Sequence, residues 1–266
     1  MGSLAVYARL VRAQLYSQMQ YRASFLLQLF STFSSTLVEL LAILILFRTF
    51  GELGGWKVGE VAFLYGLVSI AFSFADMLGE GFERLSTQVR SGEFDRVLTR
   101  PLSPFMQIMA SEFPLRRLGR VMQGILAVGL AQHWGELEWT PLRALVFGSA
   151  ILTTALVFFS VLVIGAALCF WTVEGTEVQN VFTYGGTELA SYPMHIYNRW
   201  LRLTFLVVMP LGITTYYPSL YILDKSDPLG LPVWVQFVAP VVAGAFFSAS
   251  LLIWRLGTNH YQSTGS

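Results

Sequence analysis

Six long apolar segments constrain this chain more than any other feature of its sequence. A helix that crosses a bilayer needs about 20 predominantly apolar residues, and segments near that length recur along the 266 residues. Only 12% of the residues are charged, about half of the roughly 25% that is usual in soluble domains. The sequence therefore predicts an all-α membrane protein with six transmembrane helices, over 23–47, 61–78, 118–132, 142–171, 203–223 and 233–254.

The residues before the first span form an element of their own. Apolar side chains from Leu4 to Met19 recur at helical spacing, and arginines take some of the other positions. This pattern is typical of an amphipathic helix that lies on the membrane surface. A plain extension of the first span is the alternative. We therefore divide the chain into an N-terminal amphipathic interfacial helix at 1–22 and a single transmembrane domain at 23–266.

The basic residues set the orientation of the predicted helices. Six spans place both termini on one side of the membrane, and that side receives most of the 17 lysines and arginines. Only Arg48, Lys57, Arg143 and Lys225 fall on the other side. Because cytoplasmic loops are enriched in Lys and Arg, both termini are expected in the cytosol. All tryptophans fall at predicted span ends, as in an aromatic belt: Trp56, Trp134, Trp139, Trp171, Trp200, Trp234 and Trp254.

The segment 79–117, between the second and third spans, has a well-defined local pattern. Gly92 is a plausible helix terminator, and Pro101 forces the residue before it out of a helix. Ser103 and Pro104 are typical of an N-cap followed by proline at the first helical position. We expect a short helix, a turn, a second short helix, a Pro-fixed turn and a helix that returns to the membrane. Such a mixed-charge surface suits the docking of a partner, and an interfacial linker is the alternative.

The sequence lacks the motifs of nucleotide, metal or covalent chemistry. A phosphate-binding loop needs a lysine followed by Ser or Thr after a glycine-rich turn, and neither Lys57 nor Lys225 has that context. The three histidines are scattered, and the single cysteine, Cys169, excludes a multi-cysteine zinc site. A net charge of +1 gives no basic surface for nucleic acid. We expect no catalytic residue, metal site or cofactor in this chain.

Two acidic residues lie within predicted spans, Glu39 near the middle of the first and Asp76 one turn from the inner end of the second. Intramembrane carboxylates are costly, and their default interpretation is functional. Either could line a polar translocation path. The alternatives are a protonated carboxyl bonded to a neighbouring helix for Glu39, and a side chain that snorkels to the interface for Asp76.

The predicted fifth span is interrupted by Pro210 and is expected to break near Tyr216-Tyr217-Pro218. Such a break suggests a re-entrant or gate-like element, and a kinked structural helix is the alternative. The stretch 173–202 before it is assigned to the cytosol, with a half-span inside it as the alternative. The candidate residues of a translocation path are Glu39, Asp76, Pro210, Thr214, Thr215, Tyr216 and Tyr217.

Two blocks of the sequence resemble the ABC-2 family, the permeases of type-2 ABC exporters. The first is SGEFDRVLTRPLSP at residues 91–104, between the second and third spans as in that family. The second runs from Tyr192-Pro193 to Tyr216-Tyr217-Pro218 and is similar to the signature of one bacterial subfamily. The resemblance covers nearly the whole chain. It implies a transmembrane permease domain at 23–266, in the cytoplasmic (inner) membrane of a bacterium.

The resemblance also implies partners. Two permease subunits, identical or paralogous, would pair in the lipid bilayer, and each would bind a separate ATP-binding subunit that holds ATP and Mg²⁺. The broken fifth span would supply the outer helical element of the family. The residues around 82–96 would form the coupling helix that receives the movement of the ATPase. The candidate coupling residues are Phe82, Glu83, Arg84, Leu85, Arg90, Gly92, Glu93, Asp95, Arg96, Arg100 and Pro101.

The function implied by the resemblance is ATP-driven export by alternating access at the interface of two permease subunits. An ATP-independent secondary transporter or channel is the main alternative, although the two halves of the chain show no similarity of the kind that inverted repeats produce. An intramembrane enzyme would need convergent catalytic residues at one depth, which the sequence lacks.

Overall fold

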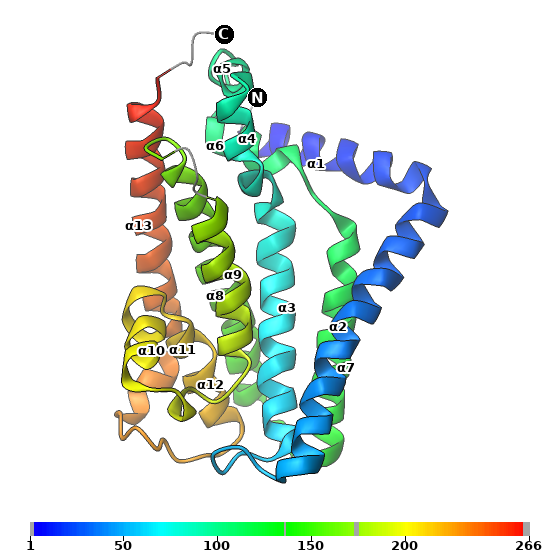
Figure 1. The fold of residues 1–266 in the computed structure, drawn as a ribbon, viewed down its shortest axis with the longest axis vertical. Helices are drawn as coiled ribbons and strands as arrows, with labels where there is room; N and C mark the ends of the chain where they lie inside the picture. Colours follow the sequence, from blue (N-terminus) through cyan, green and yellow to red (C-terminus); the bar gives the residue numbers. More distant parts are fainter. Residues whose placement is uncertain (1–2, 136, 173–175, 263–266) are drawn as a thin grey trace.

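The computed structural model describes residues 3–135, 137–172 and 176–262, which form helices joined by turns and loops (Figure 1). Helix α1 (Ser3–Gln20) lies across one end of a helical bundle. The chain turns at Tyr21, and α2 (Arg22–Phe50) then runs along the bundle. The other long members of the bundle are α3 (Val58–Glu83), α7 (Leu118–Trp134), α8 (Pro141–Leu168), α9 (Thr176–Ala190) and α13 (Ala239–His260).

Helix α3 forms the centre of the bundle and packs against α2, α7, α8 and α9. Its residues from Val61 to Ser73 are all buried. The packing of α3 on α7 depends on glycines. A Cβ atom on Gly66 would lie 2.8 Å from the carbonyl oxygen of Gly124. Helices in a membrane gain little from burying apolar surface, so small residues that allow such close contact stabilise their association.

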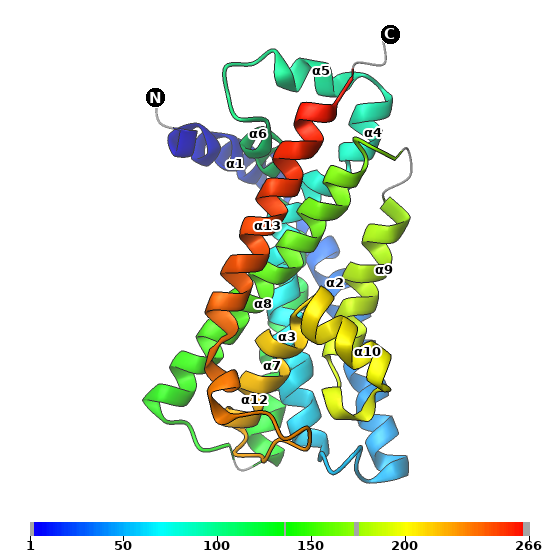
Figure 2. The same cartoon turned by 90° about the vertical axis from the view of Figure 1, so that its left-hand side faces the viewer.

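The end of the bundle that holds both termini is covered by short helices (Figure 2). These are α4 (Leu85–Arg90), α5 (Glu93–Leu98), α6 (Pro104–Ser111) and the 3₁₀ turn η1 (Leu115–Arg117). Helix α1 is bonded to this layer, because Gln14 Nε2 donates to the Ser111 carbonyl at 2.8 Å and Gln18 Nε2 donates to the Phe113 carbonyl at 2.8 Å. The placement of α1 on the membrane surface stays a prediction.

The opposite end holds a broken helical segment, residues 194–222. It consists of η2 (Met194–Ile196), α10 (Arg199–Leu203), the π-helical turn η3 (Thr204–Val208), α11 (Leu211–Thr214) and α12 (Tyr216–Ile222). The two halves of this segment, before and after Pro210, are bent by 73°. A further 3₁₀ turn, η4 (Val233–Phe237), leads into α13.

The structure does not contain a continuous helix over 203–223, because the segment is broken and bent at Pro210. Both flanks of the broken segment contact the loop that joins α2 to α3. His195 Nε2 lies 2.8 Å from the Gly54 carbonyl oxygen, and Lys225 Nζ donates to the Gly55 carbonyl at 3.1 Å. The segment therefore enters and leaves the bundle at the same end. Hydropathy identified it as apolar, but Pro210, which has no backbone N–H, ends the helix and turns the chain back.

The assignment of 173–202 to the cytosol is also wrong for most of that stretch. Helix α9 runs along α8 away from the end that holds the termini, and α10, with Arg199 and Trp200, lies in the opposite half of the bundle (Figures 1 and 2). The aromatic-belt interpretation fails for Trp56 and Trp254, which are only 1% and 4% exposed and belong to the packed interior.

Four helices in the described residues, α2, α3, α8 and α13, are long and apolar enough to cross a membrane, or five if the bent pair counts as one span. With 17 residues, α7 is about 25 Å long, less than the roughly 30 Å of a hydrocarbon core. The structure therefore confirms an all-α protein with several spans, and the number of six stays a prediction. The last span begins later than expected, at Ala239.

Candidate functional site

The segment 79–117 has the local structure that its glycine and proline residues predict. Helices α4 and α5 are joined by Ser91 and Gly92, and Gly92 adopts a left-handed φ of 71° that favours glycine. Pro104 is the first residue of α6. We refer to residues 85–98 as the α4–α5 hairpin.

One side of the hairpin is packed into the protein. Phe82, just before it, contacts Phe105 and Trp254 with ring centroids 5.1 and 5.3 Å apart. Phe94 contacts Phe170 and Tyr261 at 5.2 and 5.0 Å. Phe82, Leu85 and Phe94 are at most 1% exposed. The predicted coupling residues Phe82 and Leu85 therefore do not face a partner, and instead help to fix the hairpin to α6, α8 and α13.

Asp95 also holds the hairpin in place. The Tyr261 hydroxyl donates to Asp95 Oδ1 at 2.9 Å. Partial burial and this hydrogen bond to a carboxylate raise the pKa of Tyr261 to about 12, so the phenol keeps its proton and remains a donor at neutral pH. The residue that follows α13 is thereby bonded to α5.

The other side of the hairpin is exposed and carries charges of both signs. Arg84 pairs with Glu112 at 2.7 Å between Nη1 and Oε1. A cavity of about 280 Å³ between α4, α5 and α6 is lined by charged and amide groups that include Glu93, Arg96 and Arg100. The predicted coupling residues that the structure leaves exposed are Arg84, Arg90, Glu93, Arg96, Arg100 and Pro101.

A buried ion-pair network lies directly beneath the hairpin. Asp76 Oδ2 is 2.8 Å from Arg117 Nε, and Glu80 Oε2 is 3.0 Å from Arg117 Nη2. Glu80 also pairs with Arg116. With the neighbouring Glu83, the three acids present carboxylate oxygens within 4.8 Å of one another. Two arginines thus oppose three carboxylates, and the network joins α3 to η1, the turn that leads into α7.

The structure places Asp76 in neither of the two roles expected for it. Its side chain is 2% exposed and ion-paired, so it neither lines an open path nor snorkels to the interface. Glu83, expected as a coupling residue, lies next to this network and is only partly exposed. Both residues belong to the connection between helices.

Glu39 lies on the face of α2 that meets α3 and α7. Its Oε2 accepts a hydrogen bond from the Tyr65 hydroxyl at 2.9 Å and lies 3.6 Å from Arg120 Nη2. The Arg120 guanidinium in turn lies 5.0 Å from the centroid of the Phe72 ring. The Glu39 side chain remains 38% exposed. The expected hydrogen bond to a neighbouring helix is therefore present, and the carboxylate also has an open side.

The other candidate path residues form the interior of the broken segment. Pro210, Thr214, Thr215, Tyr216 and Tyr217 are all buried. The Thr154 hydroxyl of α8 donates to the Thr214 carbonyl at 3.0 Å. These residues hold the segment against the bundle, and they do not line a surface open to a path in this structure.

His195 fixes the broken segment to the loop between α2 and α3. Its Nδ1 lies 3.0 Å from the Tyr216 hydroxyl, and its Nε2 faces the Gly54 carbonyl. Because a carbonyl only accepts, Nε2 carries the proton and Nδ1 accepts from the tyrosine. Tyr216 also stacks on Trp56, with centroids 5.7 Å apart.

Sequence reasoning missed the partners of the buried acids. Arg117 and Arg120 were counted only as cytosolic positive charges, although both reach carboxylates of neighbouring helices. One signal was present. Asp76, Glu80 and Glu83 are spaced by four and three residues, which places them on one face of a helix, and a run of arginines opens the next long helix.

Comparison with known proteins identifies the family of this chain. A family model described as "ABC-2 family transporter protein" matches residues 33–265. The chain belongs to the ABC-2 transporter family. This ABC-2 protein is a multi-pass membrane component of a transporter, and it is not itself the catalytic component. The comparisons found no matching curated protein and no matching solved structure.

Proposed function

We propose that this ABC-2 protein is the permease subunit of an ATP-driven exporter in the cytoplasmic membrane of a bacterium, with both termini in the cytosol. Each copy binds one ATP-binding subunit through the α4–α5 hairpin, and that subunit holds the ATP and Mg²⁺. A second permease subunit, identical or paralogous, completes the transporter. The direction of transport rests on analogy with the family.

The construction of the α4–α5 hairpin is the observation that carries this proposal. Its outer side presents Glu93 and Arg96 to the surroundings, and Arg100 follows it. Its inner side is packed through Phe94 against Phe170 and Tyr261, which follow α8 and α13. Below it, the ion pairs of Arg117 extend the connection to α7. A displacement of the hairpin is therefore passed to several long helices together, as rigid-body switching requires.

The part of α2 from Leu26 to Val38 supports pairing with a second permease subunit, because Leu26, Leu27, Phe30 and Val38 are apolar and 58–70% exposed. Only 17% of the most apolar stretch of α2 is buried within the chain. Glu39 lies at the edge of this face, with its carboxylate turned toward α3 and α7 and 38% of its side chain exposed. We propose that alternating access takes place where this face meets the partner, with Glu39 as a lining residue.

Charge reversal on the outer side of the hairpin tests the proposal. We expect Glu93→Lys combined with Arg96→Glu to lose the co-purifying ATP-binding subunit and its ATP hydrolysis, while the chain stays folded in the membrane. Asp95 is left intact because its bond to Tyr261 is structural. The matched control is Glu52→Lys, an exposed acid just after α2 at the opposite end of the bundle, which should keep the partner.

Two results would count against the proposal. Retention of a fully active ATP-binding subunit by the double variant would remove the hairpin from coupling. Transport by the chain in vesicles without any ATP-binding subunit would favour an ATP-independent secondary transporter or channel.

A further inference from the structure

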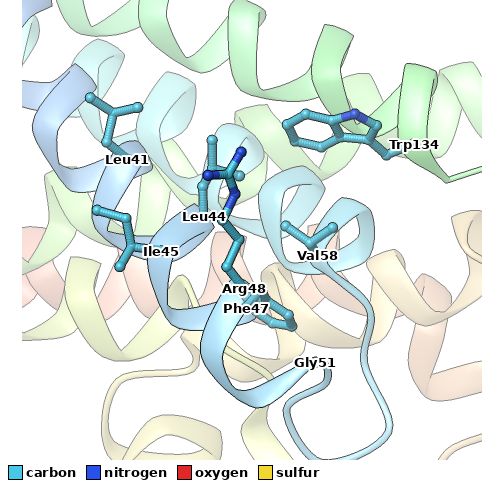
Figure 3. A pocket seen from close by; sticks show the side chains of 8 residues that line it. All are labelled: Leu41, Leu44, Ile45, Phe47, Arg48, Gly51, Val58 and Trp134. Atoms are coloured by element: carbon cyan, nitrogen blue, oxygen red, sulfur yellow. The ribbon is translucent and has the colours of Figure 1, made fainter.

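A lateral groove at the end of the bundle opposite the termini has no role in the mechanism described above. It lies between the last three turns of α2, the start of α3 and the end of α7, and has a volume of about 590 Å³ (Figure 3). This volume falls within the range of small-molecule sites. Leu41, Leu44 and Ile45 lie on one side of the Arg48 side chain, and Val58 and Trp134 lie on the other.

We propose that this groove binds one phospholipid of the adjacent leaflet, with the lipid phosphate on the Arg48 guanidinium and an acyl chain against Leu41, Leu44 and Ile45. This inference goes beyond the proposed function and does not require an ATP-binding subunit. It rests on the charge of the groove, its depth in the bilayer and the apolar character of its walls.

The positive charge of the groove favours an anionic ligand. Among the described residues that line it, Arg48 alone is charged. Among the residues that the structure describes, no acidic side chain forms an ion pair with Arg48, whereas Arg143 and Lys225 at the same end are paired with Asp224 and Glu60. An arginine fork is well matched to phosphate oxygens, with which it forms short, charge-assisted hydrogen bonds.

The depth of the groove matches the phosphate level of a leaflet. Arg48 lies in the last turn of α2, and Trp134 is the last residue of α7 and is 44% exposed. Tryptophan and arginine at helix ends favour the headgroup region. The stretch of α2 from Leu41 to Arg48 is about 10 Å long. That length is most of the hydrocarbon thickness of one leaflet, which is roughly 15 Å. The groove can therefore hold the upper part of an acyl chain.

A second copy of the chain is a less suitable occupant. It would have to bring an acidic group to this depth to balance Arg48, and the described α2 carries only Glu39, which already binds Tyr65 and Arg120. Each phospholipid in the bilayer carries a phosphate at this level. A phospholipid thus supplies both a phosphate for Arg48 and an acyl chain for the apolar walls of the groove.

Native mass spectrometry of the full chain in mild detergent, titrated with phosphatidylglycerol, tests this inference. We expect one tightly retained lipid per chain. Arg48→Gln should weaken retention about tenfold or more, the effect of losing one charge-assisted contact, and Arg48→Lys should restore part of it. Leu44→Trp should also weaken retention by filling the groove. The matched control is Arg22→Gln, which removes the same charge from the other end of α2.

Three outcomes would overturn the inference. The first is equal lipid retention by the wild type, Arg48→Gln and Arg22→Gln. The second is complete displacement of the lipid by millimolar inorganic phosphate, which would indicate a plain anion site. The third is a lipid-free dimer that cross-links through Ile45→Cys, which would make a second copy the occupant. Quenching of Trp134 by brominated phosphatidylglycerol, measured against Trp134→Phe, gives a readout that does not depend on variants of Arg48.

Discussion

At the residue scale, the most consequential side chains are charged groups inside the membrane domain. Asp76 and Glu80 are both ion-paired with Arg117 where α3 meets the turn that leads into α7. Glu39 is balanced by Arg120 and bonded to Tyr65. Ionised groups away from water persist only when paired in this way. These residues connect helices, and of the acids predicted to line a path only Glu39 keeps an exposed side.

Replacing Arg117 alone should therefore destabilise the protein more than replacing both Arg117 and its partner Asp76. Arg117→Gln leaves Asp76 buried without its partner, at a cost of about 3–5 kcal/mol. Adding Asp76→Asn to that variant should recover part of the loss, because the uncompensated carboxylate is gone. The measurement is a double-mutant cycle of unfolding in detergent. Strictly additive effects of the two substitutions would show that the ion pair is not coupled.

At the element scale, the contact between α3 and α7 depends on the absence of side chains at Gly66 and Gly124. Gly66→Val would press a branched side chain against the backbone of α7 and should cost about 1–3 kcal/mol by overpacking. Gly129→Val, on α7 at a position with open space around it, should cost little. Thermal unfolding of the two variants in detergent provides the comparison. Equal melting temperatures would contradict this account of the helix contact.

The broken segment shows how far helical elements could be predicted from the sequence. Apolar length correctly located α2, α3 and α8, and the residues Gly92 and Pro104 correctly located the turns around α4, α5 and α6. The length of an apolar segment does not predict whether the segment crosses the bundle or turns back within it. Residues 203–223 are apolar enough for a span, but the contacts of His195 and Lys225 with the α2–α3 loop, which turn the segment back, are long-range.

Cysteine accessibility distinguishes this re-entrant arrangement from a spanning helix. In a Cys169→Ser background, Asn198→Cys and Ser226→Cys should react with a membrane-impermeant maleimide from one side. Thr99→Cys, after the α4–α5 hairpin, should react from the other. Labelling of Asn198→Cys and Ser226→Cys from opposite sides would restore the single fifth span.

At the scale of the whole molecule, the two ends of the bundle differ in construction. One end holds both termini, α1 and the α4–α5 hairpin (Figure 1). It has charged groups outside and an aromatic core of Phe82, Phe94 and Trp254 within. The other end holds the broken segment, packed by buried tyrosines and threonines. The sequence predicted this division through the positions of its arginines and prolines. It could not reveal which coupling residues point inward, because that depends on how α6, α8 and α13 surround the hairpin.

Site-specific cross-linking in native membranes tests most directly the claim that the hairpin receives an ATP-binding subunit. A photoreactive maleimide is attached to Glu93→Cys in the Cys169→Ser background, and Glu52→Cys serves as the matched control. We expect Glu93→Cys to capture a polypeptide with a phosphate-binding loop, and Glu52→Cys not to capture it. Capture of the same products at both positions, or of no ATP-binding protein at Glu93→Cys, would contradict the account.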